Sequence, residues 1–325
     1  MNNTRFSFRF LRPLLSHNTR TNMSAQAGNM EKMSNTLSGS FSEADKHENT
    51  WVRTSKTIIA KLAAPLLPKM GLTADRTAPV TLLDNAAGAG VMAQEVNRTL
   101  PRTTLQAGSI LATDFSEALV GITQERIKTE GWINTEARVA DAQDTKLPDN
   151  TYSHVSILLG LHIIPNPDAA VKEAIRVLKP GGVFGATTFP THTENKFWFA
   201  DVKTAFDAMP FDAPLPDKMP MQMHDSGTWY EPAWVATHLE SLGLKDVKVN
   251  VQGDSYYIRS ADEFIDMFGM MLGFVTKMFW SEEQLAAHSA DEVKALVHKH
   301  LVEKHKGQGW EVKWDVIYMT GRVDK

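Results

Sequence analysis

The stretch Leu82-Leu83-Asp84-Asn85-Ala86-Ala87-Gly88-Ala89-Gly90 joins a short apolar run to a helical pattern that begins at Val91. The run Val80–Leu83 is typical of a buried strand, and the small residues after it let the backbone approach a ligand closely. A strand, a tight turn and a helix form the unit that holds nucleotide-like ligands at the carboxyl end of a parallel sheet. The stretch therefore predicts a ligand site over Ala86, Gly88 and Gly90.

Strands and helices alternate along the chain beyond this stretch. Such alternation, with helices of about 10 to 15 residues, predicts βαβ units built around a parallel sheet. The expected strands are 80–83, 109–112, 137–140, 155–159, 183–188, 245–251 and 312–319, and the expected helices between the first five are 91–100, 116–130 and 168–178.

Composition divides the 325 residues into a tail and a folded part. Residues 1–40 are polar and lack apolar periodicity, which predicts a disordered tail. The remainder, 41–325, is expected to fold as one α/β domain. Within it, a helical pattern over 43–67 predicts an N-terminal lid, and the stretches 190–230 and 255–307 predict helical cap insertions.

Acidic residues follow three successive expected strands, at Asp84, Asp114 and Asp141. The carboxyl ends of parallel strands meet in one crevice, so these carboxylates are expected to converge. A carboxylate at Asp84 would repel a pyrophosphate, which disfavours a hydride-transfer oxidoreductase, but it suits a ligand with an ammonium group, such as S-adenosylmethionine. Asp114 can accept from both hydroxyls of a ribose and Asp141 from the amine of an adenine. Each alone would be explained as a helix cap or turn residue, but the three together predict one ligand site.

Residues 80–189 therefore resemble a class I S-adenosylmethionine-dependent methyltransferase. The resemblance implies a Rossmann-like α/β fold with a seven-stranded, mostly parallel sheet whose last strand is reversed. The first family motif, an acidic residue and three alternating glycines, matches at Asp84, Gly88 and Gly90. It departs at Ala86, and because alanine disfavours positive φ, a lower affinity for the cofactor is expected. The cofactor contacts implied by the resemblance are Asp84, Ala86, Gly88, Gly90, Asp114, Phe115, Asp141, Ala142, Leu159 and Gly160.

A wider resemblance, over about 45–320, is to a fungal secondary-metabolism branch that includes the gliotoxin bis-thiomethyltransferase. It implies methylation of a small-molecule acceptor at sulfur or oxygen. The alternative is a catalytically weak, methyltransferase-like regulatory or partner-binding protein, which the departure at Ala86 permits. The segments that carry the likeness are 82–86, 130–134, 147–149, 242–249 and 279–284.

Histidines are the candidate general bases. A thiol acceptor has a pKa near about 8.5 and needs only a modest shift to ionise, whereas an alcohol or phenol needs a positioned base. His162 follows the fourth strand, and His192 and His224 lie in the first insertion. A histidine bonded to backbone explains each of them more simply, so no catalytic residue is assigned.

Methionine and aromatic side chains crowd the segment 267–280. Methionine adapts to irregular apolar ligands. The apolar residues are too many for one helix face, which favours a substrate pocket or a partner surface, such as that of a homodimer, over a purely core-facing helix. The candidates for the pocket are Trp51, Met270, Met271, Phe274 and Trp280.

Composition excludes several classes of function. The net charge is −4, without the basic surplus of a nucleic-acid-binding protein. The absence of cysteine excludes disulfides, cysteine-ligated metals and cysteine nucleophiles. His298, His300 and His305 do not share one helix face, so no metal site is expected. No apolar run reaches about 18 residues, so no membrane span is expected.

The N-terminus is rich in arginine and lacks acids. Arg5, Arg9 and Arg12 precede the first acidic residue, Glu31, in a background of Phe, Leu, Ser and Asn. This composition is typical of a mitochondrial transit peptide. The alternatives are a disordered tail, or a true start at Met23, on a cytoplasmic protein. A tagged full-length protein confined to the cytosol would count against import.

Overall fold

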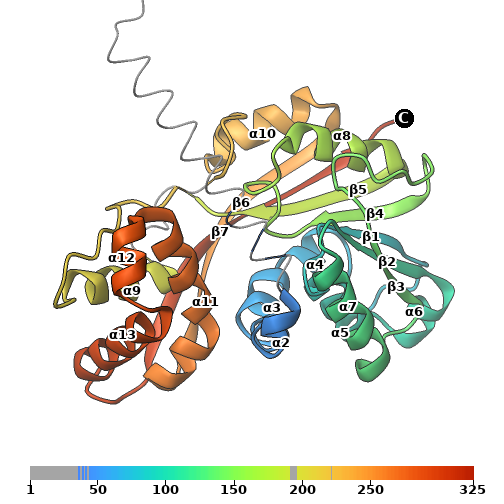
Figure 1. Ribbon diagram of the computed structural model, residues 1–325. Helices are drawn as coiled ribbons and strands as arrows, with labels where there is room; N and C mark the ends of the chain where they lie inside the picture. The colour runs from blue at the N-terminus through green and yellow to red at the C-terminus, as the bar shows by residue number, and fades with distance from the viewer. Residues whose placement is uncertain (1–35, 37–38, 40, 42–43, 191–195, 221) are drawn as a thin grey trace, which may run out of the picture.

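A computed structural model describes residues 36, 39, 41, 44–190, 196–220 and 222–325. The predicted tail, apart from Thr36 and Gly39, lies outside the described residues, as does His192. Figure 1 shows a sheet covered by helices, with a second group of helices set to one side of it. Across the described ranges, no helix combines the length and apolarity that a membrane span requires.

One sheet organises the fold. In the part of the chain that the structure describes, it has seven strands in the order β3-β2-β1-β4-β5-β7-β6. Strand β7 runs antiparallel to both of its neighbours, β5 and β6, while the other strands run parallel to one another. The predicted Rossmann-like sheet with a reversed last strand is confirmed. The strands are β1 Thr81–Asn85, β2 Ser109–Asp114, β3 Thr135–Val139, β4 Tyr152–Ile157, β5 Leu178–Thr188, β6 Leu244–Ile258 and β7 Trp310–Val323.

Helices cover both faces of the sheet and bury a separate apolar cluster on each face. Two of these helices begin at polar caps: the side chain of Ser116 accepts from Leu119 N, and that of Asn166 accepts from Ala169 N. One face carries α5 Val91–Thr99, α6 Arg102–Ala107 and α7 Glu117–Glu130, and the other carries α8 Pro167–Val177 and α10 Pro232–Ser241. Sequence reasoning missed α6, because six residues are too few to show a helical period.

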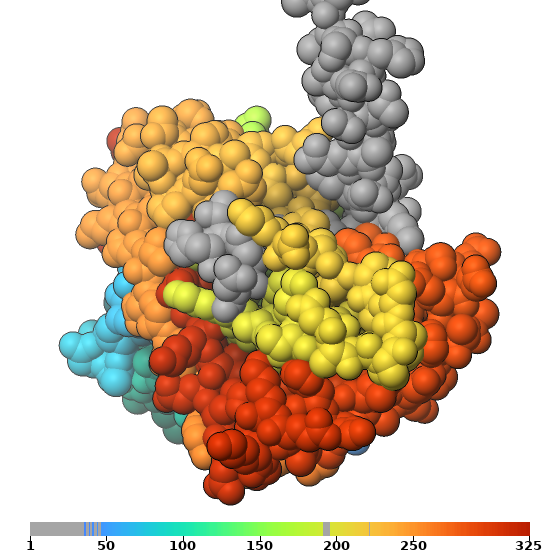
Figure 2. Space-filling model, turned by 90° about the vertical axis from the view of Figure 1, so that its left-hand side faces the viewer, coloured from blue at the N-terminus to red at the C-terminus, as the bar shows by residue number. Residues whose placement is uncertain are grey.

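The paired strands β6 and β7 extend beyond the rest of the sheet, and the cap packs on this extension. Only Ile317–Arg322 of β7 pair with β5, whereas the pairing with β6 continues to Trp310. The projecting half supports the cap, which comprises α9 Phe197–Asp207, α11 Ala261–Phe279, α12 Glu282–Ala287 and α13 Ala290–Lys304. Sequence reasoning expected both strands to be shorter, and it expected a helical insertion over 190–230 without giving the bounds of α9. Figure 2 shows the cap from outside, with the yellow segment around α9 against the red helices.

The three cap helices after β6 begin where the sequence pattern Ser-x-x-Glu/Gln indicates. The side chains of Ser260, Ser281 and Ser289 each accept a hydrogen bond from the backbone N–H three residues later. Of these three serines, only Ser281 also makes the reciprocal bond, in which its N–H donates to Oε1 of Gln284 at 2.9 Å. Such caps satisfy donors that the first helical turn leaves unpaired.

Asp201 of α9 connects α9 to the end of α13 and to the start of β7. Its buried carboxylate accepts from Lys304 Nζ at 2.8 Å, from Trp310 Nε1 at 2.8 Å and from His305 Nε2 at 3.3 Å. Asp201→Ala removes the acceptor of Trp310 Nε1 and of His305 Nε2, and one of two acceptors of Lys304 Nζ, which also donates to Thr204 Oγ1 at 2.9 Å. We therefore expect a loss of about 2–3 kcal/mol in the free energy of unfolding. Denaturant titration measures the loss, and hydrogen exchange locates it in α9 and α13. Asp207→Ala, at the exposed end of α9, is the matched control. Equal stability of the two variants would contradict the prediction.

The lid segment, residues 44–69, corrects a prediction. A single helix was expected over 43–67, but the structure divides the segment into four pieces. The backbone breaks at Thr57, with φ −117° and ψ −96°, where the hydroxyl donates to Arg53 O at 2.8 Å. Pro65 has no N–H to continue the helical ladder. The pieces are η1 Ala44–His47, α2 Glu48–Lys56, α3 Ile58–Ala63 and α4 Leu66–Lys69.

Candidate functional site

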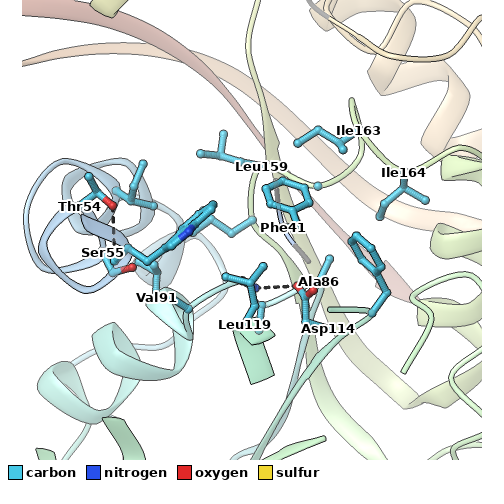
Figure 3. A pocket seen from close by; sticks show the side chains of 18 of the residues that line it. Phe41, Thr54, Ser55, Ala86, Val91, Asp114, Leu119, Leu159, Ile163 and Ile164 are labelled. Atoms are coloured by element: carbon cyan, nitrogen blue, oxygen red, sulfur yellow. Dashed lines mark hydrogen bonds between the residues drawn. The ribbon is translucent and has the colours of Figure 1, made fainter. Parts of the chain in front are cut away.

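A cavity of about 460 Å³ lies where the carboxyl ends of the strands meet the lid segment and the cap. One wall comes from the loop after β1 and from the residues that follow β2, β3 and β4. The opposite wall comes from α2 and α3 of the lid and from α9 and α11 of the cap. Figure 3 shows Thr54, Ser55 and Val91 at one end, Asp114 and Ile164 at the other, and Phe41 between them. The crevice expected from the strand order therefore exists.

The loop after β1 has the tight turn that its small residues indicate. Ala86 and Gly88 line the cavity, at φ 57° and φ 56°. The left-handed conformation costs a residue with a Cβ about 1–2 kcal/mol, so Ala86 carries strain that a glycine would not. Gly90 does not line the cavity. It is the N-cap of α5 at φ 75°, where an added Cβ would lie 2.8 Å from Thr123 Cγ2.

Asp84 lies beneath this loop and does not line the cavity. It is fully buried, and it accepts from Ala93 N at 3.3 Å and from Ser156 Oγ at 3.1 Å. Burial raises the pKa of Asp84 to about 7, although both hydrogen bonds act to lower it. The sequence placed Asp84 in contact with a ligand, whereas the structure gives it the role of holding the first turn of α5 beneath the loop.

Asp114 does reach the cavity. Its Oδ2 accepts from Gly88 N at 2.9 Å and its Oδ1 from Ser116 N at 3.0 Å, which holds the carboxylate against the loop. Burial raises the pKa of this carboxyl despite the backbone hydrogen bonds. Phe115, which also lines the cavity, is 48% exposed, and its ring lies 6.1 Å from that of Phe41. A carboxylate with free lone pairs beside an exposed ring suits a ligand with hydroxyls and a flat ring.

The ends of β3 and β4 complete this wall. Asp141 and Ala142 line the cavity, and Asp141 accepts from Gln143 N at 2.9 Å. Leu159, at φ 51°, and Gly160 line it as well. An added Cβ at Gly160 would lie 2.7 Å from Ile157 Cγ2, which is too close for any residue with a side chain unless Ile157 moves.

The opposite wall is apolar. Trp51, Met270 and Met271 line the cavity, but Phe274 and Trp280 do not. Phe274 is buried in the core, and Trp280 donates its indole N–H to Pro214 O at 3.2 Å behind α11. Met267 and Phe268, from the segment 267–280 expected to supply the pocket, also line this wall. Sequence reasoning did not assign the wall's other apolar residues to the pocket, which include Phe41, Ile58, Phe197 and Trp198.

The described candidate bases lie outside the cavity wall. Burial lowers the pKa of His162 to about 4, and its ring packs edge-on against Phe189, with centroids 5.6 Å apart. His224 has a ring nitrogen 2.9 Å from Leu161 O, and burial lowers its pKa as well. Both rings therefore support the loop after β4, in the manner of structural histidines.

The histidines of α13 and its C-cap contact other residues of the cap. His298 contacts Asp262 at 2.9 Å, and His300 contacts Thr204 at 3.2 Å. His305 joins the Asp201 cluster and stacks on Trp310, with centroids 4.0 Å apart. Each histidine has a different partner, so the three side chains do not converge on one point.

Comparison with known proteins identifies a methyltransferase domain. Residues 82–182, from β1 to the start of β5, match a family model described as a methyltransferase domain. The chain therefore contains a methyltransferase domain and is similar to class I S-adenosylmethionine-dependent methyltransferases. S-adenosylmethionine is therefore its methyl donor, and its acceptor is a small molecule.

Several curated relatives come from Aspergillus species. It is 27% identical over 261 residues to "Methyltransferase tpcH" of Aspergillus fumigatus, a match that covers 80% of this chain and 90% of the relative. It is 26% identical over 251 residues to "Acetylaranotin bis-thiomethyltransferase" of Aspergillus terreus, covering 77% and 85%. It is 26% identical over 261 residues to "Methyltransferase ktnA" of Aspergillus niger, covering 75% and 84%. These matches extend beyond the methyltransferase domain into the lid or the cap.

Proposed function

We propose that this methyltransferase methylates the sulfur or oxygen of an apolar small molecule of fungal secondary metabolism, bound between the strand ends and the cap. The wall formed by Trp198, Met267, Met270 and Met271 supports an apolar acceptor, because flexible methionines and a flat indole adapt to rigid ring systems. The named activity of the Aspergillus terreus relative supports sulfur as one of the acceptor atoms.

The residues at the strand ends fit S-adenosylmethionine. We assign the ribose hydroxyls to the lone pairs of Asp114 that face the cavity, and the adenine to Phe115, Asp141 and Ala142. Gly160 lines the same wall, and because it has no side chain its backbone can contact the cofactor directly. The left-handed turn from Ala86 to Gly88 supplies the opposite side of the cradle.

The chemistry of transfer is an in-line displacement, for which the protein supplies position and a dry site. When bound, S-adenosylmethionine supplies an electrophilic methyl group on a sulfonium. Asp114 and the β1 loop hold the donor in a fixed orientation. The lid segment and α11 exclude water and place the acceptor against it. Among the residues that the structure describes, no histidine, lysine or arginine lines the cavity.

The position of Asp114 in the cavity wall carries this proposal, and calorimetry tests it. We expect wild-type protein to bind S-adenosylmethionine and S-adenosylhomocysteine but not NAD. Asp114→Asn should lower both affinities by about tenfold or more, because hydrogen bonds to a charged acceptor contribute about 1.5–3 kcal/mol. Asp217→Asn, at a side chain 96% exposed, is the control. Unchanged binding by the Asp114 variant would refute the assignment.

Assembly and location are separate proposals. We propose a homodimer because β6 is an edge strand with Val251 and Tyr257 exposed, and edge strands pair readily. A monomer in analytical ultracentrifugation would refute it. The arginine-rich start supports mitochondrial import as the second proposal.

A further inference from the structure

The lid carries an unpaired hydroxyl that reaches the cavity. Ser55 of α2 is only 2% exposed, and it lines the cavity wall. Within the residues that the structure describes, its backbone oxygen accepts from the Gln94 side chain at 3.4 Å, but its hydroxyl makes no hydrogen bond. This oxygen is not one of the fully buried polar atoms that lack a partner, so the small exposed part of Ser55 includes it. Its hydrogen-bond partner must therefore come from the cavity.

The other polar side chains of the wall do not offer the same donor. Thr54 also lines the cavity, but its hydroxyl donates to Thr50 O at 2.9 Å within α2. Asp114 and Asp141 are carboxylates, which accept hydrogen bonds and donate none when ionised. Among the described residues of α2 that line the cavity, Ser55 therefore has the hydroxyl that is free to donate to a ligand.

Ser55 lies at the end of the cavity that is remote from Asp114. Figure 3 shows Ser55 and Val91 at one end and Asp114 at the other, and all three line the cavity. With the ribose hydroxyls at Asp114 and the adenine at Phe115 next to it, the amino-acid end of the cofactor extends toward Ser55 and Val91. This step rests on the proposed position of the cofactor.

The start of α5 favours negative charge at the same end. Gly90 is the N-cap of this nine-residue helix, and Val91 is its first residue. The N–H groups of a first helical turn have no acceptor within the helix, and they carry a positive partial charge. Asp84 takes the N–H of Ala93 from beneath the loop, at 3.3 Å, without lining the cavity. A free hydroxyl and a helix N-terminus at one end of a cavity together favour an anionic group.

We infer that the hydroxyl of Ser55 donates a hydrogen bond to the carboxylate of the amino-acid end of S-adenosylmethionine. The bond between Gln94 of α5 and the backbone oxygen of Ser55 fixes the lid against the same helix. The lid therefore recognises the cofactor through a neutral donor as well as covering it. Ser55 binds the methyl donor in this role and moves no proton.

Calorimetry with two ligands tests this contact. S-adenosylhomocysteine carries the carboxylate, whereas 5′-methylthioadenosine has the same nucleoside and a thioether without the amino-acid part. On the full chain, Ser55→Ala should bind S-adenosylhomocysteine about tenfold more weakly, while its affinity for 5′-methylthioadenosine should stay within about twofold of the wild type. Retained binding of the nucleoside also shows that the variant is folded at the site.

A second variant distinguishes a carboxylate from an ammonium group beside Ser55. Ser55→Asp places a negative charge there, which repels a carboxylate but attracts an ammonium group. We expect its affinity for S-adenosylhomocysteine to fall about a hundredfold, well beyond the loss in Ser55→Ala, while 5′-methylthioadenosine still binds. Unchanged or tighter binding of S-adenosylhomocysteine by Ser55→Asp would overturn the inference.

Thr50→Val is the matched control, because Thr50 lies on the same helix but does not line the cavity. Its affinities for both ligands should equal those of the wild type. Equal losses for both ligands in Ser55→Ala, or no loss for either, would overturn the inference and leave the cofactor assignment intact. A wild-type protein that binds neither ligand would overturn both.

Discussion

Replacing Arg126 by methionine is expected to lower the free energy of unfolding by about 3–5 kcal/mol. Arg126 is 2% exposed, and its guanidinium donates to Ala89 O, to the Gln94 side chain and, at 2.8 Å, to Glu130. Its carbon lies 4.9 Å from the centre of the Trp132 ring. Removing one partner of a buried ionic cluster leaves the other partners desolvated and unpaired, which explains the expected size of the loss. Denaturant titration measures it.

The same substitution is expected to loosen the cofactor site, because Arg126 joins two of its walls. Ala89 belongs to the β1 loop. Gln94 and Glu130 reach the lid: the Gln94 side chain donates to Ser55 O at 3.4 Å, and Glu130 pairs with Lys56 at 3.0 Å. Ser55 and Lys56 both belong to α2 of the lid. Binding of S-adenosylhomocysteine should therefore weaken, and hydrogen exchange should rise in α2 as well as in the loop.

Lys128→Met is the control, since Lys128 lies on the same helix with its side chain 74% exposed. We expect its effect to stay within about 0.5 kcal/mol. The pKa of Glu130 provides a second measurement. Burial acts to raise this pKa, but hydrogen bonds from Arg126 and Lys56 hold it below the usual value. In Arg126→Met that pKa should rise. Equal stability of the two variants would contradict the assigned role of Arg126.

The strand order and the site end of the sheet could be predicted because parallel strands impose them. Asp114 and Asp141 come after buried strands, and both line the cavity as expected. Asp84 differs because β1 continues to Asn85, two residues past the predicted end. A residue inside a strand is held between its neighbours, and Asp84 faces Ser156 of β4 across the ladder.

The apolar wall was only partly predictable because helical spacing does not show where a cavity ends. Met267, Met270 and Phe274 share a face of α11, but Phe274 lies a turn further along, where that face meets the core. Phe41 and Trp198 come from segments with little apolar periodicity. They reach the site only because the lid and the cap fold back over the strand ends, which local sequence does not encode.

The buried carboxyl of Asp84 is expected to make the free energy of unfolding depend strongly on pH. Its pKa is raised by burial from 3.8 to about 7, so between these pH values the folded protein holds a proton that the unfolded chain releases. Stability must then fall as pH rises, by about 1.4 kcal/mol per pH unit and by about 4 kcal/mol across the window. Asp84→Asn removes this contribution because an amide does not titrate. The variant should gain stability relative to the wild type as pH rises from 4 to 7.

Denaturant titrations at several pH values measure this difference directly. Asp217→Asn, at the exposed side chain used above, is the control, and its stability should follow that of the wild type at every pH. The sign of the stability difference identifies a buried carboxyl. An ion-paired carboxylate has a lowered pKa, so replacing it by Asn would lower the stability relative to the wild type as pH rises over the same range. Parallel curves for wild type and Asp84→Asn would mean that Asp84 is ionised in the folded protein. In that case the carboxylate beneath the β1 loop would present a negative charge to the ammonium group of the cofactor.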